Sequence, residues 1–233
     1  MKQNGLNNLT SWLQNAGVHL SADQSRLLSV YLDELWEWNR KVNLTGLSSR
    51  EQIIKELLID SLVPSAFLPD EGRLLDLGSG AGMPAIPLKI CKPGLTMDLV
   101  EANLKKAIFL KQVIRLAGLT RIRVIRGRIE DIRDLIHPEG YHVITARALA
   151  HLSQSLAWCC PHLITGGKVV AFLGKNYNQI LKESSDVIER YGLSLLRTIP
   201  YILPGKKFER NILIFEKERL DQKVQQKSAA EAS

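Results

Sequence analysis

The sequence lacks any apolar run close to the roughly 18 to 20 residues that a membrane-spanning helix needs. Polar residues follow the opening Met1–Gly5, where a signal peptide would carry its apolar core. We therefore expect a cytoplasmic protein with no membrane partner.

Cysteine is also scarce. The three cysteines, Cys91, Cys159 and Cys160, form no Cys-x-x-Cys pair, and no histidine accompanies them at metal-ligand spacing. The sequence therefore predicts neither a metal site nor a disulfide framework. We expect the three thiols to be small buried core residues.

The composition also shows no strong excess of apolar or of charged residues. The 233 residues are 45% hydrophobic and 24% charged, which is typical of a globular protein with a single large core and a small appendage; we expect a monomer. The 31 basic residues exceed the 24 acidic ones, for a net charge of +7. This charge favours a polyanionic partner such as nucleic acid, but it is modest and also fits proteins that have none.

Residues 1–70 are predicted to be a helical extension. Apolar residues recur at helical spacing over Asn7–Gln14, Ser21–Arg40 and Ser49–Phe67. Ser21 with Gln24 and Ser48 with Glu51 have the spacing of a capping box. The segment 68–72, which contains Pro and Gly, ends this region.

Residues 71–217 are predicted to form an α/β domain, a Rossmann-like fold with a mainly parallel sheet. The expected parallel strands are Arg73–Leu77, Thr96–Val100, Arg121–Arg126, His142–Thr145 and Lys168–Leu173. The expected helices are Pro84–Ile90, Leu104–Gly118, His151–Leu163 and Gln179–Tyr191. Two last strands, Ser194–Ile202 and Asn211–Glu216, predict an antiparallel hairpin at one edge, and residues 218–233 are expected to be a disordered tail.

A glycine-rich loop connects the first strand to a helix. Gly78, Gly80 and Gly82 alternate after the strand, and Pro84 suits a first helical turn. Glycines allow a ligand to approach the backbone, and a helix amino end attracts anionic groups. A dinucleotide fingerprint would need Gly where Met83 stands, and a Walker loop would need Gly-Lys-Ser/Thr, which is absent.

The pattern that begins at Asp76 instead resembles the S-adenosylmethionine (SAM) loop of Rossmann-like methyltransferases. The next strand ends at Glu101, placed to accept hydrogen bonds from ribose hydroxyls. The third strand leads to Ile129 and Glu130, where such enzymes hold the adenine edge. We expect SAM to contact Asp76, Gly78, Gly80, Gly82, Glu101, Ile129 and Glu130.

Over residues 20–216 the chain resembles the RsmG (GidB) family, the guanine-N7 methyltransferases of small-subunit ribosomal RNA. The resemblance rests on Trp38–Thr45, Asp60–Leu62, Asp76–Leu88, Lys105–Lys106, Phe109–Leu110, Gly127–Glu130, Ala146–Ala148 and Arg210–Asn211. It implies a helical extension on a SAM-binding domain and methyl transfer to 16S ribosomal RNA or the small ribosomal subunit. It also implies that Gly78, Met83, Ile129, Glu130 and Arg147 lie at or near SAM.

Three positions depart from the family pattern. Leu57 stands where a histidine is common, Ala81 where a proline is common, and the lysine expected after the fifth strand is displaced to Lys175 or lost. Two alternatives to the enzyme stay open, and the first is motivated by Leu57 and the displaced Lys175. One is a SAM-responsive RNA-binding protein that has lost catalysis, and the other is a small-molecule methyltransferase.

Guanine N7 needs no general base, because its in-plane lone pair is available at neutral pH. The sequence has no Asn/Asp-Pro-Pro-Tyr/Phe motif for amino nitrogens and no Pro-Cys or Thr-Cys nucleophile for pyrimidine carbons. Arg147, at the end of the fourth predicted strand, is expected to position the acceptor.

Basic and amide side chains are the candidate RNA contacts, although each basic cluster also fits an ordinary solvated face. Asn39, Asn43 and Thr45 fit equally well as contacts to a splayed-out base or as caps of a turn. The full set of candidates is Asn39, Asn43, Thr45, Lys105, Lys106, Arg128, Lys175, Lys206 and Arg210.

Overall fold

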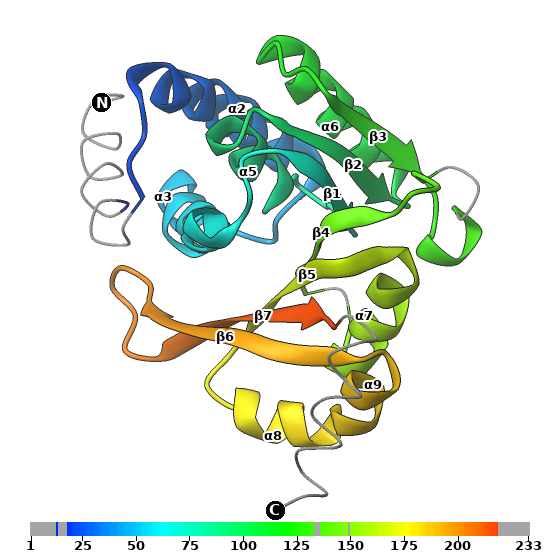
Figure 1. The fold of residues 1–233 in the computed structure, drawn as a ribbon. Helices are drawn as coiled ribbons and strands as arrows, with labels where there is room; N and C mark the ends of the chain where they lie inside the picture. The colour runs from blue at the N-terminus through cyan, green and yellow to red at the C-terminus, as the bar shows by residue number, and fades with distance from the viewer. Residues whose placement is uncertain (1–12, 14–17, 133–135, 149, 219–233) are drawn as a thin grey trace, which may run out of the picture.

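The computed structural model describes residues 13, 18–132, 136–148 and 150–218. Almost all of the predicted helix Asn7–Gln14 and nearly all of the predicted tail therefore lie outside the described residues. The described chain folds around one seven-stranded sheet (Figure 1).

The strand order of the sheet is β3-β2-β1-β4-β5-β7-β6. The parallel strands are β1 (Gly72–Leu77), β2 (Leu95–Glu101), β3 (Ile122–Arg126), β4 (Tyr141–Ala146) and β5 (Leu163–Leu173). The antiparallel hairpin at the edge consists of β6 (Leu193–Ile202) and β7 (Glu209–Lys217). The predicted fold class and the edge hairpin are confirmed.

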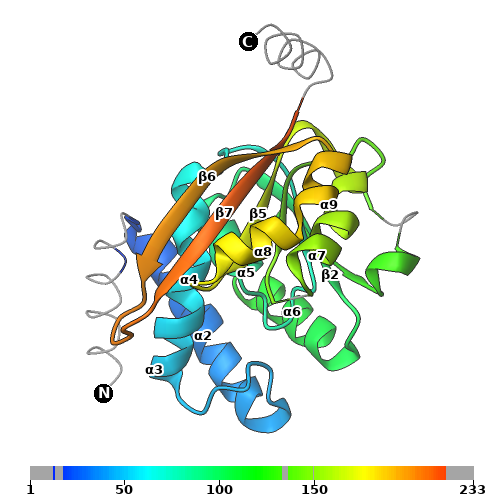
Figure 2. The ribbon, with the colours of Figure 1, turned by 90° about the horizontal axis from the view of Figure 1, so that it is seen from below.

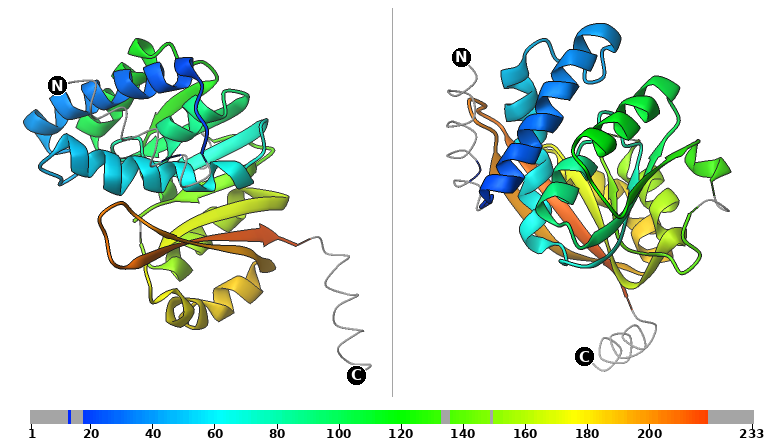
Figure 3. Two further views of the ribbon diagram at one scale, coloured as in Figure 1. Left: turned by 90° about the vertical axis from the view of Figure 1, so that its left-hand side faces the viewer. Right: turned by 90° about the horizontal axis from the view of Figure 1, so that it is seen from above.

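Helices cover both faces of the sheet (Figures 1 and 3). One face carries α5 (Ala85–Cys91), α6 (Leu104–Leu116) and the extension helix α2 (Ala22–Val42). The other carries α7 (Leu152–Cys159), α8 (Tyr177–Glu183) and α9 (Ser185–Arg190). Because β1 lies between β2 and β4, the crossovers change direction there, which is where open α/β sheets bind ligands.

The second part of the extension is one helical path with three hydrogen-bonding patterns. It runs through α3 (Arg50–Ile53), the π-helix η1 (Ile54–Leu58), α4 (Ile59–Leu62) and the 3-10 helix η2 (Val63–Phe67). Ser21 and Gln24 form the predicted capping box of α2. The second prediction was wrong by one residue, because Ser49, and not Ser48, caps α3 through the backbone N–H of Gln52.

Two predicted boundaries also differ. The strand β5 begins at Leu163, five residues before the predicted start, after the short 3-10 helix η4 (Cys160–His162). The added part of the strand passes through Gly166 and Gly167, beside a register shift between Tyr141 and Val143. The predicted last helix is two helices, α8 and α9, that meet at Ser184.

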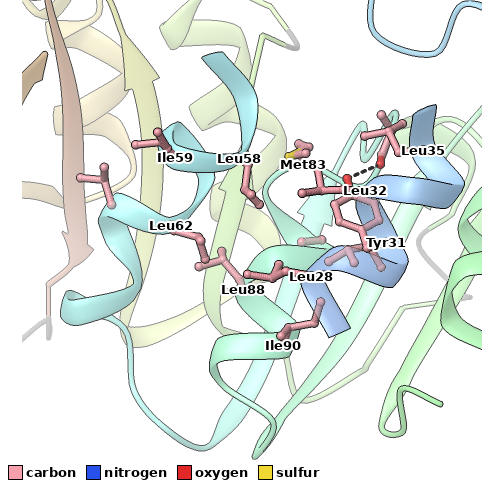
Figure 4. Packing of buried hydrophobic residues seen from close by; sticks show 14 of the residues in the cluster. Leu28, Tyr31, Leu32, Leu35, Leu58, Ile59, Leu62, Met83, Leu88 and Ile90 are labelled. Carbon is pink, nitrogen blue, oxygen red and sulfur yellow. Dashed lines mark hydrogen bonds between the residues drawn. The ribbon is translucent and has the colours of Figure 1, made fainter. Parts of the chain in front are cut away.

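The extension shares a core with the sheet. Leu28, Tyr31 and Leu32 on α2 and Leu58 and Leu62 of the second helical path pack in one buried cluster with the α5 side of the sheet. Figure 4 shows these residues together with Met83, Leu88 and Ile90. The loop after β1 is thereby held between the sheet and the extension.

Candidate functional site

The glycine-rich loop leaves β1 at the point where the crossovers change direction. The backbone N–H of Ser79 donates to Val100 O over 2.9 Å, and that of Gly82 donates to Ser79 O over 2.7 Å. Gly78 and Gly80 have φ angles of +70° and +56°, which L side chains rarely adopt. An added Cβ at Gly80 would meet only Gly78 O, at 3.7 Å, so a ligand can approach the backbone there.

Glu101 at the end of β2 is the acidic partner of this loop. Its side chain is buried; Oε2 accepts the N–H of Gly80 over 2.7 Å, and Oε1 accepts the N–H of Asn103 over 2.7 Å. The predicted juxtaposition of loop and acid is therefore present. The carboxylate joins the ends of β1 and β2 and is fixed by backbone donors.

A cavity of about 380 Å³ opens beside this pair. Five of the residues expected to contact SAM line it, namely Gly78, Gly80, Glu101, Ile129 and Glu130. Lys106 and Arg128, from the candidate RNA contacts, also line it. Trp158 on α7 lines the cavity as well and was not predicted as a site residue. Its only sequence signal was its place in a helix that follows β4.

Asp76 lies under the loop. Its Oδ1 accepts the hydroxyl of Thr145 over 2.5 Å, whereas Oδ2 is buried with no hydrogen-bond partner among the described residues. Burial raises the pKa of Asp76 to about 6, against the opposing effects of the Thr145 hydrogen bond, the nearby Ser79 hydroxyl and the charge of Arg147. Asp76 is thus a buried acid that titrates near neutral pH.

The other two predicted loop residues lie where the loop packs against the extension. Gly82 and Met83 lie in the buried part of the loop, and the Ser61 hydroxyl is 3.3 Å from Met83 Sδ. The Tyr31 hydroxyl donates to Ala81 O over 2.7 Å. Side chains from both helical parts of the extension therefore fix the loop that carries the glycines.

Arg147 follows β4 and meets a carboxylate that sequence analysis did not assign to the site. Asp60 on α4 is 1% exposed, and its Oδ2 lies 3.1 Å from Arg147 Nε. Its Oδ1 accepts from Arg210 Nη1 over 3.0 Å and also from the hydroxyl of Tyr201. One buried carboxylate therefore holds two guanidinium groups.

This cluster lines a second cavity of about 320 Å³, which we call the acceptor pocket. The lining residues are Asp60, Arg147, Ala148, Phe172, Leu173, Gly174, Tyr201, Phe208 and Arg210. The register of the sheet explains their meeting, because Ala146 pairs with Ala171, Leu173 with Asn211, and Tyr201 with Arg210. Ala146 also pairs with Leu77, the residue before Gly78, so Arg147 and the pocket adjoin the glycine-rich loop.

The uncharged polar residues of the predicted RNA set, Asn39, Asn43 and Thr45, form a turn after α2. Asn39 Nδ2 donates to Leu47 O over 2.8 Å, and Asn39 Oδ1 accepts from both the N–H and the hydroxyl of Thr45. Asn43 is the left-handed C-cap of α2, and its Oδ1 accepts the N–H of Gly46. These contacts favour the turn-capping alternative for all three residues.

The basic members of the set lie around the two cavities. Lys105 and Lys106 begin α6 after the cap Asn103, and Arg128 is exposed beyond β3. Lys175 is exposed just after Gly174, and Lys206 Nζ lies 3.0 Å from Glu56 Oε1. Of these cations, Lys106 and Arg128 line the first cavity, and Lys206 is paired to the extension.

Three other features bear on the chemistry. Burial raises the pKa of Cys91 and of Cys160 to about 12, and it raises that of Cys159 as well. Among the described residues, no group of three or more His, Cys, Asp or Glu side chains is arranged to hold a metal ion. No helix in the described ranges is long and apolar enough to cross a bilayer.

Solved structures with a similar fold include methyltransferases. A methyltransferase from Pyrococcus furiosus matches with a TM-score of 0.58 and 16% identity, covering 84% of this chain and 100% of that one. M. jannaschii TYW2, solved in complex with AdoMet, matches with a TM-score of 0.53 and 14% identity over 68% of this chain and 74% of that one. At these identities the likeness shows the fold alone.

Sequence relatives identify the family. The chain is 38% identical to the Ribosomal RNA small subunit methyltransferase G of Chloroflexus aggregans, over 89% of this chain and 86% of the relative. It is 36% identical to the protein of the same name from Roseiflexus, over 86% and 85%. The GidB family model, described as rRNA small subunit methyltransferase G, matches residues 24–201. The chain therefore belongs to the rRNA small subunit methyltransferase G family.

Proposed function

We propose that this protein uses SAM to methylate N7 of a guanine in 16S ribosomal RNA. Family membership supports methylation of small-subunit ribosomal RNA. The observation that carries the proposal in the structure is the place of Arg147, which lines the acceptor pocket and follows Ala146, the β4 residue paired with Leu77 at the start of the glycine-rich loop. A cofactor site and an acceptor site are therefore adjacent, as a direct transfer requires.

The cavity beside the loop fits SAM. Glu101 offers a fixed carboxylate to ribose hydroxyls, Trp158 and Ile129 offer apolar surface to the adenine, and the φ and open space at Gly80 admit a ligand against the backbone. Asp76 does not line this cavity, but the charge of its carboxylate, whose Oδ2 is buried without a hydrogen-bond partner in the described part of the chain, would favour a cationic ligand. These residues would hold the cofactor together with Gly78 and Glu130 at the rim.

SAM supplies a methyl group bound to a positively charged sulfur. Guanine N7 is a nucleophile at neutral pH without losing a proton, so the protein needs to orient the base and exclude water. The raised pKa values of the three cysteines argue against a thiolate attack on a pyrimidine ring. The chemistry of the site therefore fits a ring-nitrogen acceptor.

Arg147 and Arg210 are the proposed acceptor ligands. Arginine donors recognise O6 of guanine, which lies beside N7 on the same edge of the base. Asp60 holds Nε of Arg147 and Nη1 of Arg210, so the two cations keep fixed positions on one wall of the pocket. We assign Arg147 a positioning role, with no general base.

Phosphates of the RNA would be bound by cations around the cavities. The proposed contacts are Lys105, Lys106, Arg128 and Lys175, with Lys206 contributing from the edge hairpin. The partner is 16S ribosomal RNA or the assembled small subunit, which implies action in the cytoplasm. We propose that the protein acts as a monomer.

The decisive experiment is incubation with SAM that carries a tritiated methyl group and with small ribosomal subunits that lack the modification. We expect label in 16S ribosomal RNA at N7 of a guanine, reduced by rising salt because phosphate contacts weaken. SAM binding and RNA retention without label at any salt concentration would favour an RNA-binding protein without catalysis. Labelling of a small molecule with no RNA affinity would favour the other alternative.

A further inference from the structure

Two phenyl rings in the acceptor pocket have no part in the function proposed above. Phe172 lies near the end of β5 and is partly buried against the core, whereas Phe208, in the hairpin before β7, is 48% exposed. Figures 2 and 3 show the hairpin end beside the helical path of the extension. Phe208 thus lies at a pocket wall formed by the hairpin, facing solvent with half of its surface.

Cations flank both rings. Arg147 Cζ is 6.0 Å from the ring centroid of Phe172, and Lys206 Nζ is 6.0 Å from that of Phe208. The ion pair of Lys206 with Glu56 ties the hairpin to the extension. The ring of Phe208 is therefore carried by a segment that is anchored to the extension.

A pocket with this composition can bind an unpaired base in two ways. The guanidinium groups of Arg147 and Arg210 are edge ligands, because they donate hydrogen bonds in the plane of a base. A phenyl ring is a face ligand, because it stacks on the base. A target base that is turned out of the RNA needs such a surface to replace the stacking it has lost.

We infer that Phe208 contacts the substrate, stacking on the target guanine while Phe172 forms the apolar floor of the pocket. This inference rests on the proposed function and adds a substrate contact that arises from the edge hairpin. Phe208 also fits the departures from the family pattern. Where family members have a lysine after the fifth strand, this chain has Leu173, which lines the pocket beside Phe172, so its contacts to the base are more apolar.

The test uses the full chain and small ribosomal subunits that lack the modification. We expect Phe208→Ala to lower kcat/KM for the subunit by about fivefold to 150-fold, the range that corresponds to losing one stacked base. SAM affinity, measured by calorimetry, should stay unchanged, and so should the urea midpoint, because the ring is half exposed. Phe208→Tyr should keep wild-type kcat/KM, whereas Phe208→Leu, apolar but not planar, should not.

Ile202→Ala is the matched control. Ile202 is 62% exposed at the end of β6 and does not line the acceptor pocket, so its loss should leave kcat/KM unchanged. The inference is overturned if wild type methylates the subunit and Phe208→Ala does so equally well, if Phe208→Leu matches wild type, or if Ile202→Ala loses as much. Absence of methylation by wild type would instead overturn the proposed function, and this inference with it.

Discussion

Asp76 is the residue through which we expect pH to act on the proposed cofactor site. Burial raises its pKa to about 6, and its Oδ2 has no hydrogen-bond partner among the described residues. A raised pKa means that the protonated form stabilises the fold at low pH and that this contribution is lost as pH rises through about 6. The ionised form at higher pH is the one that a cationic ligand prefers.

We therefore expect SAM affinity to increase as pH rises from 5 to 7, because the cationic end of SAM favours ionised Asp76. Calorimetry near pH 6 in two buffers of different ionisation enthalpy should reveal proton release on binding. Asp76→Asn should bind more weakly at pH 7 and show a flat pH dependence. Equal proton release by the variant and wild type would assign the linkage to another group.

Asp60 stabilises two guanidinium groups that would otherwise repel each other. We expect Asp60→Asn to lower the free energy of unfolding by about 3–5 kcal/mol, because it leaves Arg147 and Arg210 partly buried without a counter-charge. Urea denaturation measures this. Asp33→Asn is the control, since Asp33 is half exposed in its pair with Arg50, and about 0–1 kcal/mol is expected there. Equal losses in the two variants would contradict the role given to Asp60.

At the scale of elements, the glycine-rich loop depends on close packing against two helices. Gly82 has a φ of +86°, and an added Cβ would lie 2.6 Å from Ile86 Cγ1 on α5 and 3.0 Å from Leu110 Cδ2 on α6. Gly46 has a similar φ of +73°, but an added Cβ there would meet nothing within 4 Å. An alanine at Gly46 would therefore meet backbone strain alone, whereas an alanine at Gly82 would meet both backbone strain and steric overlap.

We expect Gly46→Ala to cost about 1–2 kcal/mol, from the backbone alone. Gly82→Ala should cost about 1–3 kcal/mol more, because the loop or α5 has to move. Urea denaturation compares the two, and SAM affinity should fall for Gly82→Ala only. The same loss of stability for both variants would show that the contacts of Gly82 with α5 and α6 relax without cost.

Element types followed from the sequence more closely than element boundaries did. Alternating apolar strands and helices predicted the parallel sheet, and the lack of a helix between the last two strands predicted the hairpin. Periodicity cannot distinguish α from π hydrogen bonding, so the change at Ile54–Leu58 was not predictable. Glycines 166 and 167 concealed the start of β5, because the same residues are common in loops.

At the scale of the whole molecule, the meeting of the glycine-rich loop with Glu101 was predictable, and the lining of the acceptor pocket was not. The glycine-rich loop and Glu101 follow or end consecutive parallel strands, whose carboxyl ends lie at the same edge of the sheet, so the sequence predicts that they lie close together. Asp60, Phe172 and Tyr201 come from three distant segments, and they meet only through the pairing of β5, β7 and β6 and the docking of the extension. No local pattern encodes such a register.

The same docking predicts that the extension and the sheet unfold as one unit. The two parts share a buried cluster, and Asp60 and Glu56 form ion pairs with residues of the α/β domain. Trp38 on α2 reports on this contact, because its ring centroid is 5.7 Å from that of Phe109 on α6. A core that crosses the boundary at residue 70 is expected to make unfolding cooperative.

We expect the fluorescence of Trp36 and Trp38 and the far-UV circular dichroism of the whole chain to change at the same urea concentration. A variant with Trp12→Phe and Trp158→Phe would confine the fluorescence signal to α2. Agreement of the two midpoints means that the acceptor pocket, which needs both parts, exists only in the fully folded molecule. A fluorescence transition at lower urea would show instead that the extension undocks first, and the pocket would then be lost before the SAM site.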